Sequence, residues 1–496
     1  MSAAAWVQSR KEIRALLPWC VTVAGATVLG GALVQRADLP GARPDHALWI
    51  ALIHVAGVLS VAAWTVGQEL AHGTLSTLLV QPAGRLRLLG TKLLVLGAAL
   101  LALGATAGAM IPEWRGPVAS RPLLIWGPVA LGLGLVPLLT LLSRRTLGGV
   151  VFAPVLPGLI LVVADRFYPL RDGLQAWPIV WYGTLVASAL GIAAFALVFH
   201  RLQVAGDGEG RPAASARGAA DRRGLSGARV VFGHWTWLSV KKELRLQQMT
   251  FAVSGLYVAG AVLVSILQRS NPLYVGPTFA ALSALHGLFI PLLAGCLASA
   301  EERQMGTLAT GLLQPRAAWT QWAIKVGVAA ALALTLGLGL PALLAWLPPI
   351  DRFQASAEFG VAAVLVLGAG VYVSSLSSNT LWALIVSFPV MGIAVEVAGV
   401  SVGPIVRILN QAMPIVPGPP TAGGLRVASI RAIEDGVAIA LALGFVMLLS
   451  VFAGRNHRSL DRSVRVVANQ VAGLILYAIG AATVSFAVSR LLWGLR

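Results

Sequence analysis

Long apolar runs constrain this chain more than any other feature of its sequence. Runs of roughly twenty residues, the length that a helix needs to cross a ~30 Å hydrocarbon core, recur from one end to the other, for example at 16–35 and 249–267. Lipid offers no hydrogen-bond partner to the backbone, so continuous apolar segments of this length cross a membrane as helices. The sequence therefore predicts an all-α polytopic membrane protein.

Composition and charge agree with this class. Charged residues make up 11% of the chain, against roughly 25% in ordinary soluble domains. The net charge of +18 suggests nucleic acid at first sight, but the basic residues are scattered among short segments between apolar runs. That distribution is the one that orients a protein in a membrane. We therefore expect membrane lipids, and no nucleic acid, among the partners.

The second strong feature is an internal repeat. Its two copies keep a constant offset, from Glu69 and Glu302 at one end to Lys92 and Lys325 at the other. The first copy reads Glu69-Leu-Ala-His-Gly73-Thr74-Leu75 and continues through Pro82 to Lys92. The second copy reads Glu302-Arg-Gln-Met-Gly306-Thr307-Leu308 and continues through Pro315 to Lys325. In each copy a polar segment of about fifteen residues separates two apolar runs, and it cannot lie in hydrocarbon. Each copy predicts a loop or short surface helix at a membrane face.

The apolar runs form two sets of six and one extra. They cover 16–35, 47–67, 86–111, 121–142, 147–164 and 177–199, then 249–267, 278–299, 322–347, 358–376, 380–400 and 433–454, and finally 467–492. We expect a first six-helix half at 1–202, a flexible cytoplasmic linker at 203–230, a second six-helix half at 231–454, and a carboxyl-terminal loop with an extra transmembrane helix at 455–496. Since each half has an even number of spans, the two repeats are expected to be parallel.

A short charged segment precedes the first run of each half, and the two segments match at nearly the same offset as the repeat. Their charged residues are Lys11, Glu12 and Arg14, and Lys242, Glu243 and Arg245. We expect interfacial helices whose basic side chains reach toward the headgroups. Placing the amino terminus in the cytoplasm puts 24 of the 37 basic residues in the inner segments and the linker. Both copies of the repeated polar segment then face the cytoplasm.

With the Glu-x-x-x-Gly-Thr-Leu motif and its downstream proline and lysine in cytoplasmic loops, the chain resembles permease subunits of ATP-binding-cassette exporters of the ABC-2 type. The resemblance covers essentially the whole chain, as two permease halves fused in one. It implies that the loop between the second and third spans of each half forms a coupling helix that docks on a separate ATPase, beside the charged interfacial helix. Two copies of that ATPase subunit are implied. The residues carried over to ATPase coupling are Glu69, Gly73, Thr74, Pro82, Glu302, Gly306, Thr307 and Pro315.

The local chemistry of the motif suits this role. Glycine allows a sharp turn where a helix leaves the membrane, threonine can cap the next short helix, and proline ends that helix. The glutamate of each copy can pair with the basic interfacial helix or with the ATPase. The alternative is a membrane loop with ordinary capping and no coupling role.

No Gly-x-x-x-x-Gly-Lys-[Ser/Thr] motif occurs, and no cytoplasmic segment is long enough for a nucleotide-binding domain. We therefore expect a transport subunit and not an enzyme, without a cofactor or metal of its own, and ATP bound by the partner subunit. The expected location is the cytoplasmic membrane, the expected direction is export, and the sequence does not select a substrate.

Three ionisable residues within the spans are further candidates, because such residues are functional by default: His54, His286 and Glu396. A structural hydrogen bond to a neighbouring helix is the alternative for each histidine. A secondary transporter with two six-helix repeats shares the expected topology, although it more often carries intramembrane charges for ion coupling. A membrane-embedded enzyme needs a cluster of reactive side chains at one face, and the outer loops show none. A structural scaffold would not account for two docking segments.

Overall fold

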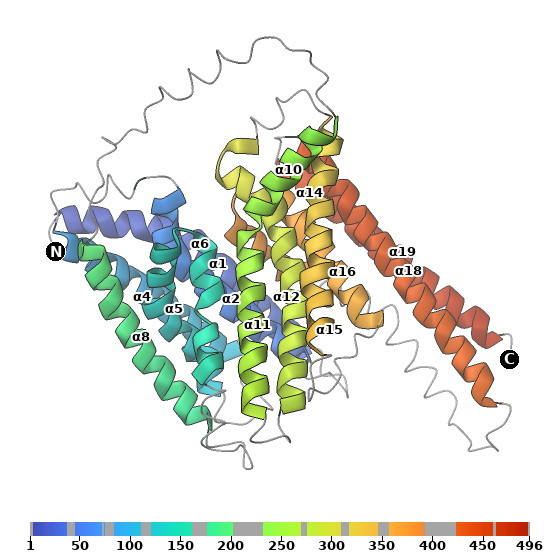
Figure 1. Ribbon diagram of the computed structural model, residues 1–496, viewed down its shortest axis with the longest axis horizontal. Helices are drawn as coiled ribbons and strands as arrows, with labels where there is room; N and C mark the ends of the chain where they lie inside the picture. Colours follow the sequence, from blue (N-terminus) through green and yellow to red (C-terminus); the bar gives the residue numbers. More distant parts are fainter. Residues whose placement is uncertain are drawn as a thin grey trace, which may run out of the picture. The chain divides into compact units, whose positions relative to one another are not determined.

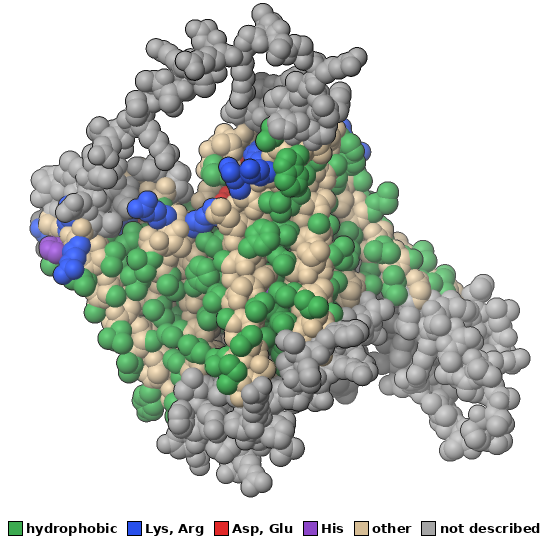
Figure 2. Space-filling view, viewed as in Figure 1, with side chains coloured by type: hydrophobic (Ala, Val, Ile, Leu, Met, Phe, Trp, Pro, Cys, Tyr) green, Lys and Arg blue, Asp and Glu red, His purple; other side chains and the backbone are tan. Residues whose placement is uncertain are grey.

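The computed structural model describes most of the chain. It covers residues 3–36, 45–71, 74, 84–110, 121–160, 176–201, 232–268, 275–308, 317–345, 357–388, 390–391, 423–459 and 463–494. Within these ranges the regular structure is helical, without a strand. Ten helices in this part are long and apolar enough to cross a membrane. Hydrophobic side chains lie along the outward faces of the helices, as Figure 2 shows. The protein is thus an all-α multi-pass membrane protein.

The chain divides into two compact units, Met1–Lys242 and Glu243–Arg496, called here the first and second unit. The helices of the first unit are α1 (Ala3–Arg36), α2 (Asp45–Ala71), α4 (Arg85–Met110), α5 (Arg121–Ser143), α6 (Thr146–Phe152) and α8 (Ala176–Arg201) (Figure 1). Helix α2 packs against α1, α4, α5 and α6. Glycine brings α5 and α8 together, because a Cβ at Gly134 would overlap the carbonyl of Ser188.

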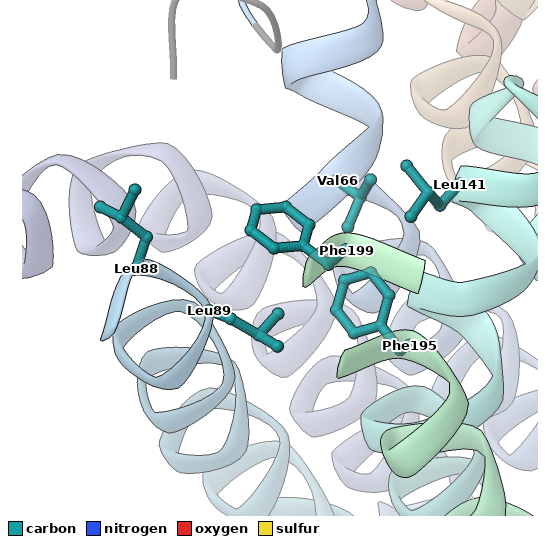
Figure 3. Close-up of a cluster of buried hydrophobic side chains, with 6 residues drawn as sticks. All are labelled: Val66, Leu88, Leu89, Leu141, Phe195 and Phe199. Carbon is teal, nitrogen blue, oxygen red and sulfur yellow. The ribbon is translucent and has the colours of Figure 1, made fainter. Parts of the chain in front are cut away.

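A cluster of buried hydrophobic side chains lies at the carboxyl-terminal end of α8. We call it the apolar cluster; it contains Val66, Leu88, Leu89, Leu141, Phe195 and Phe199. Figure 3 shows the rings of Phe195 and Phe199 extending from successive turns of α8 toward Val66 of α2. The two ring centroids lie 6.0 Å apart. Four helices of the first unit, α2, α4, α5 and α8, therefore share one hydrophobic cluster.

The second unit begins within helix α10. Its elements are α10 (Phe232–Leu246), α11 (Gln248–Gln268), α12 (Val275–Gln304), α14 (Ala318–Leu332), the π-helix η2 (Ala333–Gly339), α15 (Leu340–Leu344), α16 (Ala357–Leu376), a helical segment at 380–388, α18 (Gly423–Arg458) and α19 (Val464–Gly494). Helices α12 and α16 pack closely because Gly295 and Gly370 carry no side chain. A Cβ at Gly295 would lie 2.8 Å from the Leu367 oxygen, and one at Gly370 would lie 3.0 Å from the Leu292 oxygen.

The ten candidate spans coincide with ten of the thirteen predicted runs. The other three stay predictions. In the run at 147–164, helix α6 is followed by a turn at 153–154 and a second helical segment at 155–160. In the run at 380–400, residues 392–400 lie outside the described part. The last run, 467–492, lies within α19, whose 31 residues correspond to about 46 Å of helix.

The two charged segments differ from the expected pair of interfacial helices. In the first unit the segment is not a separate helix, because α1 runs unbroken from Ala3 to Arg36. In the second unit, α10 ends at Leu246 and α11 starts at Gln248. The intervening Gln247 donates its amide to the Ala294 oxygen at 3.0 Å and accepts the Thr250 hydroxyl at 2.7 Å. These side-chain bonds hold a turn that Leu16, the matching position of the first unit, cannot form.

Candidate functional site: two buried lysine–glutamate clusters

A buried ion cluster joins three helices of the first unit. Lys92 of α4 places Nζ 2.7 Å from Oε1 of Glu12 on α1 and 3.3 Å from Oε1 of Glu69 on α2. None of the three side chains is more than 4% exposed. These three residues are called the first cluster. One ammonium thus holds together the charged segment, the end of the second span and the start of the third.

The second unit contains a cluster of the same composition. Lys325 of α14 places Nζ 2.9 Å from Oε1 of Glu243 on α10 and 2.6 Å from Oε2 of Glu302 on α12. All three side chains are at least nine-tenths buried. These residues form the second cluster. Its lysine and its α12 glutamate are the repeat counterparts of Lys92 and Glu69, and its α10 glutamate occupies the position in the second charged segment that Glu12 occupies in the first.

Further polar groups complete the first cluster. Glu12 accepts hydrogen bonds from the Gln8 amide at 2.8 Å and from the Gln68 amide at 3.5 Å. Glu69 also pairs with Lys11 at 3.2 Å and accepts the hydroxyl of Thr74. Moving two carboxylates out of water is costly, and additional hydrogen bonds of this kind offset the cost. The arrangement therefore specifies how the three helices meet.

Each cluster also ties together the two ends of the repeated polar segment. Glu69 lies two residues before the end of α2, and Lys92 lies two turns into α4. In the second unit, Glu302 lies two residues before the end of α12, and Lys325 lies two turns into α14. Each cluster thus lies between the end of one candidate span and the start of the next.

The turn that follows α12 has the geometry expected of its glycine. Gly306 adopts a φ of +69°, in the left-handed region that a β-branched residue avoids. The Thr307 hydroxyl donates back to the Glu302 backbone oxygen at 3.3 Å. In the first unit the Thr74 hydroxyl bonds back to the Glu69 carboxylate, and its N–H donates to the Glu69 backbone oxygen at 2.9 Å. Both threonines thus bond back to the preceding helix, and the predicted cap on the following short helix lies outside the described residues.

The structure separates the charged residues of the two interfacial segments into two groups. Lys11, Arg14, Lys242 and Arg245 are exposed. The two glutamates turn inward, which the expectation of a purely interfacial role did not include. The two lysines that pair with them belonged to the repeat but were not predicted as site residues; their constant spacing was the signal. The candidates Gly73, Pro82, Pro315 and Glu396 lie outside the described residues.

The two intramembrane histidines lie apart from the clusters, and each makes a structural bond. His54 donates Nε2 to the Ile125 oxygen of α5 at 3.1 Å. His286 donates Nε2 to the Leu336 oxygen of η2 at 3.0 Å and stacks on Tyr257, with ring centroids 4.0 Å apart. A hydrogen bond to a neighbouring helix, the alternative raised for these residues, is therefore present at both.

The described part of the chain holds no group of three or more His, Cys, Asp or Glu side chains that could bind a metal ion. The chain matches no known protein-family model, no curated protein and no solved structure.

Proposed function

We propose that this chain is the transmembrane permease subunit of an ATP-binding-cassette transporter of the ABC-2 type. Two copies of a separate ATPase subunit dock on residues 69–82 and 302–315, called here the first and second coupling segment. The chain lies in the cytoplasmic membrane as two parallel repeats with its amino terminus in the cytoplasm. ATP hydrolysed by the partner drives export of the substrate.

The observation that carries this proposal is the occurrence of the same buried cluster in both units. A docking segment transmits movement only if its two ends are fixed to the helices that must move. Glu69 and Lys92 fix the first segment, and Glu302 and Lys325 fix the second. A loop that merely connected two spans would not need a buried charge cluster, whose desolvation is costly.

Charge at the surface supports the same assignment. While the glutamates of the two charged segments are buried, their basic neighbours are exposed, and Lys11 is 53% exposed. Exposed basic side chains beside a cytoplasmic docking segment suit anionic lipid headgroups and an acidic partner surface. The two charged segments can therefore lie at the membrane surface and still contact the ATPase.

Stoichiometry gives a direct test. Because one chain carries two coupling segments, one copy should bind two ATPase subunits. The tagged chain, extracted from its own cells in mild detergent, should carry a Walker-motif protein in a ratio of one to two by native mass spectrometry. The absence of any Walker-motif protein, or two permease chains for each ATPase pair, would contradict the proposal.

A matched pair of substitutions at Gly306 tests coupling itself. Gly306→Val places a β-branched residue at positive φ, whereas Gly306→Asn places a residue that tolerates this conformation. No other atom of the described residues lies within 4 Å of a Cβ built here, so neither change disturbs their packing. We expect valine to leave membrane insertion intact and to lower ATPase association and vesicle transport, and asparagine to preserve both. Equal ATPase association in the two variants would remove the coupling role of this turn.

A further inference from the structure

The unpaired last helix, α19, is attached to the second unit by a reciprocal amide pair. Gln470 of α19 donates to Oδ1 of Asn456 on α18 at 2.7 Å, and Asn456 donates to Oε1 of Gln470 at 3.2 Å. Asn456 also donates to the Ser375 hydroxyl of α16 at 3.1 Å. All three side chains are buried. These residues are called the amide site.

The same two helices remain in contact along their length. Figure 1 shows α18 and α19 running side by side. Tyr477 donates its hydroxyl to the Leu441 oxygen at 2.7 Å, and its ring lies 5.8 Å from that of Phe445. Gly444 makes room for it, because a Cβ there would overlap the Tyr477 hydroxyl. Helix α19 is therefore docked at defined points and does not merely lie in lipid.

The amide site connects to the second cluster through one arginine. Arg303 of α12 donates Nη2 to the backbone oxygen of Asn456 at 3.0 Å. The residue before it, Glu302, belongs to the second cluster. In the first unit, the repeat counterpart of Arg303 is Leu70, which has no side-chain donor. The contact between cluster and docked helix thus belongs to the second unit.

We infer that α19 positions the second coupling segment through two linked contacts, the Gln470–Asn456 amide pair and the Arg303–Asn456 hydrogen bond. It has no such effect on the first coupling segment. The interaction surface is the amide site, and its partner is helix α19 of the same chain, which places the buried amide of Gln470 opposite Asn456. This inference rests on the proposed function, since it assigns separate control to one of the two proposed docking segments. The two segments, although they are repeats in sequence, then respond to different inputs.

Labelling of single cysteines in the purified chain tests this path without the ATPase. In a background with Cys20 and Cys296 replaced by alanine, Met305→Cys reports on the end of α12, where Met305 is 53% exposed. Gly84→Cys reports on the start of α4, just after the first coupling segment, where Gly84 is exposed. Gln470→Leu should raise the maleimide labelling rate at position 305 by roughly fivefold, the factor that loss of one net hydrogen bond gives. The rate at position 84 should not change.

Two controls separate this path from general loosening. Asn469→Leu alters an exposed amide next to Gln470 and should leave both rates unchanged. Arg303→Leu installs the residue of the first unit and should raise the rate at position 305 by itself. Because the path runs through Arg303, adding Gln470→Leu to Arg303→Leu should then cause no further increase. If Gln470→Leu does not yield folded protein, Gln470→Asn, which shortens the side chain by one methylene, should give a smaller increase.

Three results would overturn the inference: an unchanged rate at position 305 in Gln470→Leu and Gln470→Asn, additive effects of Arg303→Leu and Gln470→Leu, or an equal rise at position 84. These measurements need only the permease chain. Failure to find an associated ATPase would therefore count against the proposed function and leave the inference standing, whereas failure of the labelling test would leave the coupling role of the segments intact.

Discussion

At the end of α8, Phe199 packs into the apolar cluster beside Val66, whereas at the end of α18, Asn456 takes part in the amide site. The two helices end alike in sequence, with Phe199-His-Arg in one and Asn456-His-Arg in the other. Val66 has Ser299 as its counterpart in the repeat. The Ser299 hydroxyl lies 3.5 Å from Nδ1 of His457. Apolar contacts of the first unit are thus replaced by hydrogen bonds in the second.

This contrast indicates how each unit uses the end of the helix. Phe199 can be buried in the first unit without a further helix, because an apolar ring needs no hydrogen-bond partner. A buried asparagine needs a hydrogen-bond partner, and α19 supplies one. The lysine–glutamate clusters, by contrast, are the same in both units. We conclude that the clusters serve a task common to both units, and that the amide site serves a task of the second unit alone.

The largest effect is expected from breaking what the two units share. Lys92→Met or Lys325→Met leaves two buried carboxylates without their common ammonium, and should cost about 3–5 kcal/mol of stability. The measurement is the denaturation midpoint of the purified chain in detergent. Replacing the glutamates of the same cluster by glutamine as well should recover part of the loss. A wild-type midpoint in either single variant would contradict a structural role for that cluster.

The second-largest effect on stability is expected when Phe199 is replaced by asparagine, the residue at the matching helix end of the second unit. Phe199→Asn removes a buried ring and places an amide among apolar side chains, which should cost about 3 kcal/mol. Phe199→Leu keeps the site apolar and should cost about 1 kcal/mol. The same denaturation assay compares them. If the asparagine variant were as stable as the leucine variant, the first unit would have to contain a hydrogen-bond partner near this position.

Breaking the amide site should have a smaller effect. Asn456→Leu or Gln470→Leu alone strands the partner amide and should cost about 1–3 kcal/mol. The double leucine variant leaves neither amide, so its cost should be well below the sum of the two single costs. Strictly additive costs would mean that the two amides do not act as a pair.

The smallest effect is expected at the exposed lysine that contacts the first cluster. Lys11→Met removes one partner of Glu69 but leaves Lys92, and an exposed ion pair contributes under about 1 kcal/mol. The contrast with Lys92→Met on the same carboxylate shows how far burial decides the strength of each pair. Equal losses in the two variants would contradict this ranking.

Much of the fold follows from the sequence, and so does part of the site. The ten candidate spans lie where apolar runs predicted them, because membrane insertion depends on the local length of apolar sequence. The constant offset of the repeat predicted two equivalent polar segments, and both lysines of the clusters obey it. The inward turn of Glu12 and Glu243 was not predicted, because each is flanked by basic residues that suggested a charged surface.

Local hydrophobicity and the repeat were enough to establish the class of protein, the positions of ten candidate spans and the two polar segments where a site was expected. Which charges pair, and where α19 docks, became known from the folded chain and could not be read from these patterns. Lys92 and Glu12 are 80 residues apart in the chain, and Asn456 meets Arg303 across 153. Ion pairs and amide pairs depend on side-chain distances of about 3 Å, and a linear pattern does not specify which distant helices approach that closely.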